Sequence, residues 1–528
     1  MPEHKSADQT LPSVIAAPGR ERGRQVLTLT IVFHPDTSRI GETAVFEKPR
    51  GARVRVLGRD SPGFARPESG STQLIPLNDC YVSREALQFR YSDGSVCIQR
   101  KSSSSRARIG ASELSSEIRL SQSQLNVGVA IVLGGRVVVL LRRAVQLTRS
   151  VNGSNQGHQS LGGSSAYMSQ LKDQISALAM TNLDILIQGE TGTGKELVAE
   201  AVHAASEWGS QKMIAVNMAA IPAALASSLL FGSVKGAFTG ADKASQGYFR
   251  QAQGSTLFLD EIGDTQEEIQ AQLLRALQQR EIQVVGGRVE KVKLRVISAT
   301  DAQLEDQSGN FKSALRHRLA ESEIVLLPLR QHPEDIGELL FTFVKRAMKT
   351  LGREQVLPNE HSTANEVAMW ADLFHQFVMY AWPGNIRELH NYAQQVALSS
   401  EFSAVIPQSI EARLPQFGPA QGSGKSPERE ITQARSEDYS DSEFLEGYKN
   451  ARYEVQRTAR QLGISRQAVY RRILESPGLS LASELSDEQV RTVLENYGDD
   501  LSAAAMQLKV SRAALRERIR CVSVPDSI

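Results

Sequence analysis

Residues 184–205, DILIQGETGTGKELVAEAVHAA, contain the pattern that decides the fold of the central region. The apolar run before Gly189 predicts a buried strand, and the apolar periodicity after Lys195 predicts a helix. The glycines between them allow successive backbone N–H groups to face phosphate oxygens, and the helix N-terminus adds positive potential. The stretch therefore predicts a phosphate-binding loop. The expected nucleotide contacts are Gly189, Glu190, Thr191, Gly192, Thr193, Gly194, Lys195 and Glu196.

A second apolar run, Thr256–Leu259, is followed directly by Asp260 and Glu261. An isolated Asp-Glu pair after a strand is usually a solvated acidic turn. Beside a phosphate loop, the pair has the chemistry of NTP hydrolysis, with Asp260 as a Mg²⁺ ligand and Glu261 orienting the attacking water. These two strands, a third at 294–298 and the helical patterns between them predict a parallel α/β sheet.

Composition divides the rest of the chain. The Gly-, Ser- and Asn-rich stretch 150–165 and the Pro-, Gly-, Ser- and charge-rich stretch 415–442 have the character of linkers. Short β-rich runs before the first linker predict a β-sandwich, and the last ninety residues predict only helices. The expected units are a β-sandwich at 26–145, a linker at 146–165, an α/β domain at 166–410, a linker at 411–442, and helix-turn-helix units at 443–475 and 476–528.

Total charge and cysteine content narrow the class of protein. The 528 residues include 60 Lys and Arg against 59 Asp and Glu, which excludes a uniformly basic coat for nucleic acid. Three scattered cysteines are too few for a disulfide scaffold, so a reducing cytoplasm is expected. The N-terminus lacks an apolar signal segment. The most apolar stretch, 127–141, is interrupted by Gly-Gly-Arg, which predicts a hairpin and no membrane span.

The C-terminal region contains an internal repeat. Residues 459–473 align with 505–519, and eight of the fifteen positions are identical. Each copy has the pattern of a helix, a short turn and a second helix that begins at Ser465 or Ser511. Gly463 suits the first turn, and Lys509 replaces it in the second. The pattern predicts two helix-turn-helix units.

Local charge indicates DNA as the partner of the first unit, because residues 449–472 hold seven Lys and Arg against one Glu. The second unit is preceded by an acidic stretch, so for it DNA binding and a dimerisation or packing role both stay open. The expected DNA-contacting residues are Ser465, Arg466, Gln467, Tyr470, Arg471 and Arg472 in the first unit, and Arg512 and Arg516 in the second.

Several motifs together resemble the AAA+ ATPase domain of bacterial enhancer-binding activators that act on sigma-54 RNA polymerase. They are GETGTGKE at 189–196, VNMAA at 216–220, FGSVKGAFTGA at 231–241, GSTLFLDEIGD at 254–264, RVISATD at 295–301, LPLRQHPEDI at 327–336 and WPGNIREL at 382–389. The resemblance implies ATP as substrate, Mg²⁺ as cofactor, a helical lid, assembly into a ring of six, and a Fis-type first helix-turn-helix.

The resemblance also implies roles for particular residues. Asn217 corresponds to the switch that couples Glu261 to movement, Arg387 to the lid residue that senses nucleotide, and Thr300 and Asp301 lie at the nucleotide. A Gly-bounded loop with an exposed aromatic ring and a hydroxyl suits a contact tip better than a core segment; an ordinary surface loop is the alternative. The expected sigma-54 contacts are Gly236, Ala237, Phe238, Thr239, Gly240 and Ala241.

Three positions depart from the family pattern. Lys312 stands where the first of two arginine fingers is usual, and Arg318 corresponds to the second. Lysine keeps the charge but loses the planar fork, so catalysis between subunits is expected either to be weaker or to rest mainly on Arg318. Arg316 is an additional cation, which either compensates for the missing first arginine finger or lies in solvent. Asp301 replaces the usual Asn and adds negative charge.

The N-terminal region has no receiver-like alternation of strands and helices. It weakly resembles a forkhead-associated (FHA) β-sandwich, through Gly58-Arg59 and Val82-Ser83-Arg84. The resemblance implies a phosphothreonine protein as partner, bound by Arg59, Ser83 and Arg84. Ala86 replaces the usual His, so a degenerate interaction domain is the alternative.

These observations favour an ATP-dependent transcription activator that binds upstream DNA and remodels sigma-54 RNA polymerase from a closed to an open promoter complex. One alternative is a DNA-binding regulator that acts by occupancy, with a weak or regulatory ATPase. Another is a phospho-dependent scaffold.

Overall fold

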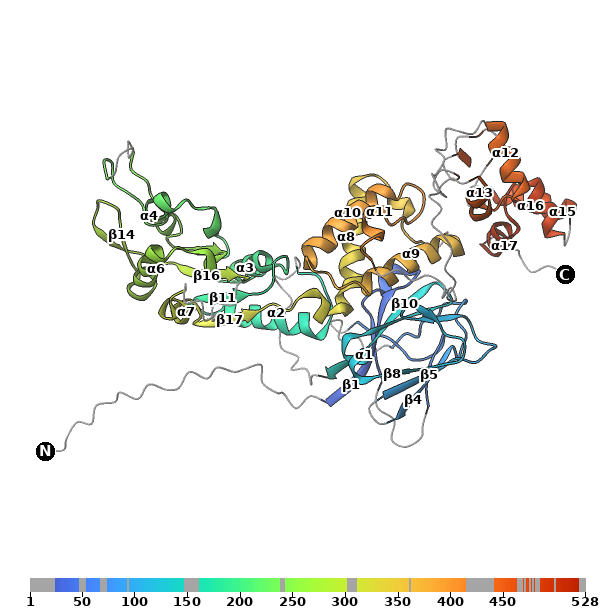
Figure 1. The fold of residues 1–528 in the computed structure, drawn as a ribbon, viewed down its shortest axis with the longest axis horizontal. Helices are drawn as coiled ribbons and strands as arrows, with labels where there is room; N and C mark the ends of the chain where they lie inside the picture. Colours follow the sequence, from blue (N-terminus) through green and yellow to red (C-terminus); the bar gives the residue numbers. More distant parts are fainter. Residues whose placement is uncertain are drawn as a thin grey trace, which may run out of the picture.

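The computed structural model of the chain describes residues 24–46, 54–66, 74–92, 95–146, 161–237, 243–301, 311–359, 362–414, 441–462, 485–497 and 500–521, together with 469, 472, 473, 476 and 479. In these residues the chain forms a β-sandwich, an α/β domain, a helical lid and a set of C-terminal helices (Figure 1).

The α/β domain is built on a parallel sheet of five strands in the order β12-β13-β16-β11-β17. Gln188 at the end of β11 lies opposite Thr300 at the end of β16, and Asn217 lies opposite Asp260. The carboxyl ends of these strands therefore meet at one edge, as parallel pairing requires. The predicted α/β fold is confirmed. The strands are β11 Ile185–Gln188, β12 Ile214–Asn217, β13 Thr256–Asp260, β16 Arg295–Thr300 and β17 Ser322–Val325.

Helices cover this sheet, and an antiparallel pair of strands extends from it. The helices are α2 Ala166–Ala179, α3 Lys195–Ala204, α4 Ala223–Phe231, α5 Tyr248–Gln251, α6 Glu267–Gln279 and α7 Ser313–Leu319, with short 3-10 helices η2 Met218–Ala220 and η3 Ile262–Asp264; the pair is β14 Glu281–Gln283 and β15 Val289–Lys291.

The lid follows as helices only, and Figure 1 places it between the α/β domain and the β-sandwich. Its core contains Trp370 and Trp382, both almost fully buried. Its elements are η4 Leu329–Gln331, η5 Pro333–Asp335, α8 Ile336–Thr350, η6 Glu354–Val356, α9 Ala364–Val378, α10 Asn385–Ser399 and α11 Gln408–Glu411.

The N-terminal region forms two sheets that enclose one apolar core, in the orders β2-β1-β10-β9-β6-β7 and β3-β4-β5-β8. Gly134 and Gly135 turn the predicted hairpin between β9 and β10. The elements are β1 Arg24–Phe33, η1 Thr37–Arg39, β2 Thr43–Phe46, β3 Arg55–Leu57, β4 Leu87–Ser92, β5 Ser95–Gln99, β6 Ala107–Ile109, β7 Ser112–Glu113, β8 Glu117–Leu120, α1 Gln122–Val127, β9 Val129–Leu133 and β10 Val137–Gln146.

Strand β9 and the first five residues of β10 are apolar on both faces. One set of alternate residues belongs to the sandwich core, namely Val129, Ile131, Leu133, Val137, Val139 and Leu141. The other set belongs instead to a cluster shared with the lid, because successive side chains of a strand point to opposite faces. These alternate residues are Ala130, Val132, Val138 and Leu140. The sandwich and the lid thus share one continuous core.

Residues 161–165, which the composition assigns to a linker, are packed. Leu161 and Ser164 are buried, and Ser165 caps helix α2. The hydroxyl of Ser165 also donates to Asp335 at 2.7 Å. The chain is therefore tied to the lid before α2 begins.

The C-terminal helices form two small cores that correspond at an offset of 46 residues. Phe444, Ala459 and Val469 of the first core match Val490, Ala505 and Leu515 of the second. The correspondence extends the sequence repeat to a preceding helix. Lys509 has a φ of +54°, the left-handed conformation that Gly463 would adopt easily. The helices are α12 Asp441–Asn450, α13 Val455–Leu462, α15 Asp487–Tyr497, α16 Leu501–Gln507 and α17 Arg512–Cys521.

Within the described ranges, no helix combines the length and the apolar character that crossing a membrane requires.

A histidine at the boundary between sandwich and lid makes lid stability depend on pH. Burial, and then the positive charge of Arg108 on β6, lower the pKa of His375 on α9 from 6.5 to about 4, while Asp372 acts in the opposite direction. The folded protein holds the neutral ring and the unfolded chain takes up a proton. Stability conferred by the neutral ring is therefore present above pH 6.5 and is lost as pH falls toward 4, by up to about 3 kcal/mol.

We predict that His375→Gln reduces this acid dependence relative to the native chain. Thermal melts followed by tryptophan fluorescence, to which Trp370 and Trp382 contribute from the lid core, measure it between pH 7 and 4.5. His317→Gln, a substitution on helix α7 outside this boundary, is the control. Equal pH slopes for the native chain and His375→Gln would contradict the assignment.

Candidate functional site

The phosphate loop joins β11 to α3 at the carboxyl edge of the sheet. Gly192 and Gly194 have φ values of +81° and +97°, which side chains rarely adopt. Helix α3 begins at Lys195, whose amino group donates to the carbonyl of Gly189 at 3.0 Å. The loop thus has the backbone form of an anion cradle with the lysine folded across it.

Asp260 and Glu261 lie at the next strand end. Glu261 has a left-handed backbone, with φ +51°, and its N–H donates to Asp260 Oδ1 at 3.0 Å. A non-glycine residue in this conformation costs about 1–3 kcal/mol, and such residues cluster at functional sites. Lys195 Nζ lies 3.9 Å from Glu261 Oε1. The three groups whose convergence the sequence predicts do lie together.

The environment of Glu261 favours a base. Burial raises the pKa of its carboxyl group, Lys195 lowers it, and the carboxylates of Asp301, Asp260 and Asp264 raise it. The net direction is upward, toward the range in which a carboxylate accepts a proton efficiently.

The donor set fits a nucleotide that brings its metal ion with it. Among the described residues, no group of three or more His, Cys, Asp or Glu side chains could hold a metal ion. Mg²⁺ commonly binds through one or two carboxylates plus substrate phosphates. Asp260 would hold the ion, which would neutralise phosphate charge, and the loop from Gly189 to Lys195 would hold the phosphates.

Three further predicted residues lie at the same edge. Thr300 is buried at the end of β16, and its carbonyl accepts from the N–H of Gly189 at 3.2 Å. Asp301 accepts from the Thr191 hydroxyl at 2.7 Å, which lowers the pKa of Asp301. Asn217 accepts from the N–H of Ala220 at 3.2 Å. In this conformation Asn217 therefore caps η2, one strand away from Glu261.

The lid touches the phosphate loop directly. A Cβ atom on Gly192 would lie 2.4 Å from the carbonyl oxygen of Gly384, so glycine alone permits this approach. The backbone N–H of Arg387 donates to the Gly192 carbonyl at 3.2 Å. The predicted sensor residue thus meets the loop through its backbone.

Two lid residues that the sequence analysis did not select connect the lid to the loop. Asn385 is fully buried; its amide donates to the carbonyl of Thr191 at 3.1 Å and accepts from the N–H of Leu329 at 2.9 Å. Arg330 donates to Glu190 at 2.8 Å. This bond, and then one from Asn385, lower the pKa of Glu190 to about 2. Their place within the LPLRQHPEDI and WPGNIREL motifs was the available signal.

The predicted intersubunit cations are paired within their own subunit. Lys312 Nζ lies 3.6 Å from Glu267 and is 39% exposed. Arg318 donates to the Leu277 carbonyl at 2.9 and 3.1 Å and pairs with Glu321. Arg316 pairs with Glu323 at 3.2 Å. Of the three side chains, Lys312 is the most exposed, and its ion pair has the longest N···O distance.

The predicted sigma-54 loop is described only at its start. Gly236 and Ala237 follow an isolated bridge between Ser233 and Ser245, beside Gly286 in the turn after β14. Phe238, Thr239, Gly240 and Ala241 lie outside the described residues.

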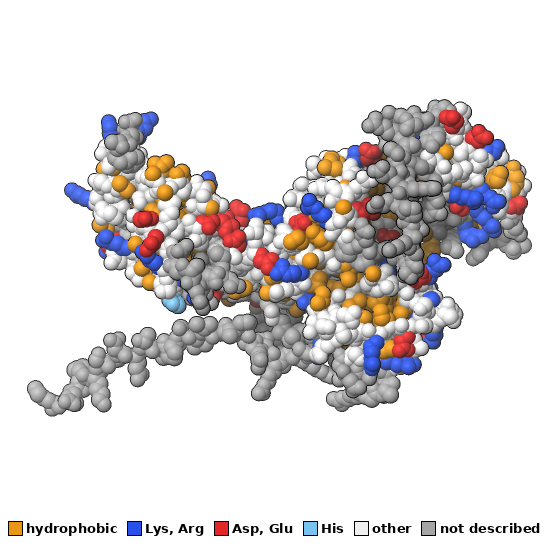
Figure 2. Space-filling view, viewed as in Figure 1, with side chains coloured by type: hydrophobic (Ala, Val, Ile, Leu, Met, Phe, Trp, Pro, Cys, Tyr) orange, Lys and Arg blue, Asp and Glu red, His pale blue; other side chains and the backbone are white. Residues whose placement is uncertain are grey.

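Most predicted DNA contacts in the first C-terminal unit also lie outside them, namely Ser465, Arg466, Gln467, Tyr470 and Arg471. Arg472 is described, and its guanidinium lies 5.5 Å from the ring centre of Phe444. In the second unit, Arg512 and Arg516 are exposed on α17. Figure 2 shows Lys and Arg side chains gathered on part of the C-terminal helices.

The three predicted phosphopeptide residues lie close together in the sandwich loops. A Cβ on Gly58 would lie 2.0 Å from the Arg84 carbonyl oxygen, so the two loops meet only because residue 58 is glycine. Arg59 and Arg84 both approach Asp60, at 3.4 and 3.6 Å. The Ser83 hydroxyl accepts from the N–H of Ser105 at 2.7 Å. A phosphate group would have to replace the Asp60 carboxylate.

Comparison with known proteins identifies the class of the central region. Residues 161–325 match the Sigma-54 interaction domain, and residues 330–426 match an AAA+ ATPase lid domain. The chain therefore contains a sigma-54 interaction domain of the AAA+ fold with its lid.

Several known proteins are similar to this chain over part of its length. The regulatory protein LuxO of Vibrio cholerae is 43% identical over 242 residues, which are 45% of this chain and 44% of LuxO. The transcriptional regulator NtrC of Escherichia coli is 42% identical over 243 residues, 46% of this chain and 50% of NtrC. A crystal structure of Brucella abortus NtrX with ADP is 29% identical, with a TM-score of 0.42, covering 60% of this chain and 69% of NtrX. The chain spans about half the length of the curated relatives it matches.

We predict that Glu261→Gln abolishes hydrolysis while nucleotide binding persists. The amide keeps the size of the side chain but cannot accept a proton, so ATP turnover should fall at least ~100-fold. Phosphate release and binding of a fluorescent ADP analogue measure the two effects. Glu200→Gln on the exposed face of α3 is the control, and comparable turnover in the two variants would rule out the assigned role.

Proposed function

We propose that the chain is an ATP-dependent transcription activator that binds upstream DNA and remodels sigma-54 RNA polymerase from the closed to the open promoter complex. One observation carries this proposal. Lys195, Asp260 and Glu261 converge at a single sheet edge within residues 161–325, the region that matches the Sigma-54 interaction domain.

In this proposal, the loop and Lys195 bind the phosphates of ATP, and Glu261 takes a proton from the attacking water. Arg387 reads the nucleotide from the lid, and Asn217 leaves Ala220 to follow Glu261 when the nucleotide changes. The loop Gly236–Ala241 contacts sigma-54. The subunits form a ring of six, as the resemblance implies, so that Lys312 and Arg318 face a neighbour's nucleotide.

DNA binding belongs to the C-terminal units. The first contains the basic stretch of sequence at 449–472, and the exposed Arg512 and Arg516 support a contribution from the second. At the N-terminus, phosphothreonine binding by Arg59, Ser83 and Arg84 stays a prediction, with a degenerate interaction domain as its alternative.

A second function, regulation by DNA occupancy with a weak ATPase, is favoured by the intersubunit cations. Lys312 lacks the planar fork of arginine, and Arg318 is bonded to a carbonyl of its own subunit. A slow motor would leave DNA binding intact.

We predict that Lys312→Arg raises ATP turnover by more than about threefold at protein concentrations where subunits associate, because guanidinium stabilises phosphate charge better than ammonium. Turnover measured against protein concentration tests this. Lys349→Arg, on an exposed part of α8, is the control. No difference between the two variants would indicate that residue 312 does not reach the neighbouring nucleotide.

We predict that Thr239→Ala abolishes open-complex formation by sigma-54 polymerase while ATP turnover and DNA binding stay within about twofold of the native chain, since Thr239 belongs to the expected sigma-54 loop and to neither the expected nucleotide contacts nor the expected DNA contacts. Promoter fragments recovered by genome-wide occupancy mapping provide the template, and permanganate footprinting detects strand opening. Lys195→Ala should lose both opening and turnover. Equal opening by the native chain and Lys195→Ala would favour the occupancy function.

A further inference from the structure

The outer face of the sandwich sheet is a docking surface for the lid. Val32, Val132, Val138 and Leu140 are buried there among lid residues. The rings of Phe33 and Phe374 lie 4.9 Å apart. An antiparallel sheet with one solvated face alternates apolar and polar residues, whereas β9 and the first half of β10, Val137–Leu141, are apolar at every position. Figure 2 shows apolar side chains along the seam between the lid and the sandwich.

Charged pairs border this apolar face. Arg142 donates to Glu334 at 2.6 Å and to the Gln331 carbonyl at 2.6 Å. Arg108 pairs with Asp372 on α9 at 2.5 Å. These contacts fix the orientation of the sandwich along both α9 and the segment that leads into α8.

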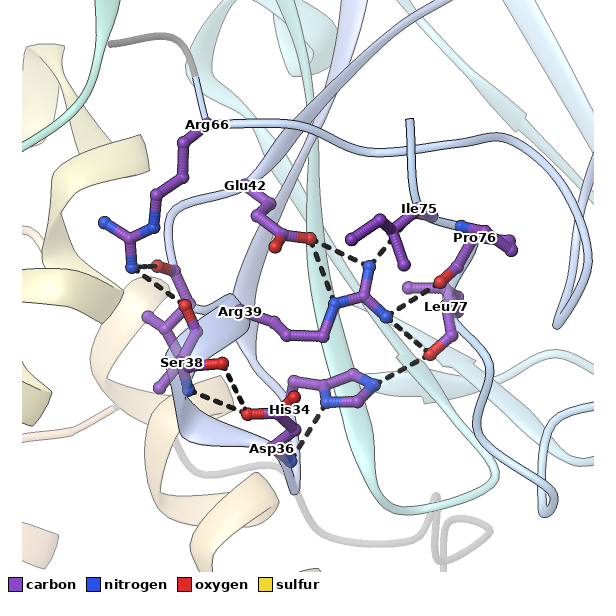
Figure 3. Close-up of polar contacts among 10 residues, drawn as sticks. His34, Asp36, Ser38, Arg39, Glu42, Arg66, Ile75, Pro76 and Leu77 are labelled. Carbon is purple, nitrogen blue, oxygen red and sulfur yellow. Dashed lines mark hydrogen bonds and ion pairs between the residues drawn. The ribbon is translucent and has the colours of Figure 1, made fainter. Parts of the chain in front are cut away.

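A buried arginine stiffens the sandwich turn that enters the interface (Figure 3). Arg39 bonds Glu42 with Nε and Nη2, and it donates to the carbonyls of Ile75, Pro76 and Leu77. The turn is thereby held to the irregular segment 75–77 beside it. Ile40, which follows, joins the cluster shared with the lid.

The closest approach involves backbone atoms. A Cβ on Gly337, in the first turn of α8, would lie 2.4 Å from the Val32 carbonyl oxygen. Neither backbone can give way as a flexible side chain would. Any larger residue at position 337 therefore separates the sandwich from the lid.

The docked segment is also the segment that holds the phosphate loop. Arg330 bonds to Glu190 of the phosphate loop, and the N–H of Leu329 donates to Asn385. Glu334, four residues after Arg330, accepts from Arg142 of the sandwich. Asp335, the residue after Glu334, bonds to both His332 and Ser165. One short stretch of chain thus contacts the sandwich on one side and the nucleotide loop on the other.

We propose that the N-terminal sandwich is a docked extension of the lid, and that its docking holds the lid against the nucleotide loop in the arrangement that binds nucleotide. This inference rests on the proposed nucleotide-binding function. Undocking frees the lid to leave the loop, and apparent affinity falls with the fraction of molecules that keep the lid in place.

Gly337→Ala in the full chain is the discriminating variant. Alanine favours a helix more than glycine does, so α8 itself is not weakened while the approach to Val32 is blocked. Arg346→Ala, on an exposed part of the same helix, is the matched control. Hydrogen exchange reports docking without nucleotide, and binding of fluorescent mant-ADP with Mg²⁺ reports the loop.

We expect Gly337→Ala to increase exchange in β9, β10 and α9, leave β11 and β13 unchanged, and weaken mant-ADP binding by about fivefold. Arg142→Glu should do the same, and adding Glu334→Arg should restore docking and affinity together. Faster exchange with unchanged affinity would refute the coupling, and unchanged exchange in both single variants would refute the docking. If the native chain bound mant-ADP no better than Lys195→Ala, the proposed function would fail, while the exchange data would still report on docking.

Discussion

Parallel strand pairing is the constraint on which the site depends. Because all five strands of the central sheet run the same way, each ends at the same edge, and residues far apart in sequence meet there. Lys195 follows one strand and Asp260 ends another, with the backbone ladder setting their register. The left-handed conformation of Glu261 then turns its carboxyl group toward Lys195. A lid is needed to close this edge, and the buried side chain of Asn385 joins the two.

Sequence reasoning recovers the features that have local signals. The loop at 189–195, the acidic strand end at 260–261 and the Gly-Gly hairpin each combine residue type with periodicity over a few neighbours, and the structure has all three. The Glu190–Arg330 pair joins residues 140 positions apart, so no local sequence pattern predicts it. The hydrogen bond from Arg318 to the carbonyl of Leu277 likewise depends on residues that are distant in sequence. The last five residues of the expected linker at 146–165 are packed against the fold, because Ser164 and Ser165 bond to groups that are distant in sequence.

The contact between sandwich and lid is indicated in the sequence by an apolar strand, but the sequence does not show which element covers that strand. An uninterrupted apolar strand indicates burial on both faces, but it does not identify what covers the second face. The free energies of these contacts indicate which of them hold the sandwich against the lid. Burying one Val or Leu side chain contributes about 1.5–3 kcal/mol, whereas the attraction within an ion pair is largely offset by solvent screening or by the cost of removing both charges from water. The apolar residues of β9 and β10 therefore supply most of the adhesion, and Arg142 and Arg108 mainly set its orientation.

The matched cores of the C-terminal units separate folding from surface chemistry. Positions 444, 459 and 469 recur 46 residues later as apolar positions, while many of the charged residues between them differ. A duplicated scaffold of this kind places few demands on its solvent-facing residues, because the interior alone decides whether three short helices assemble. The surface of one copy can therefore change while that of the other is kept, and neither change requires a new fold.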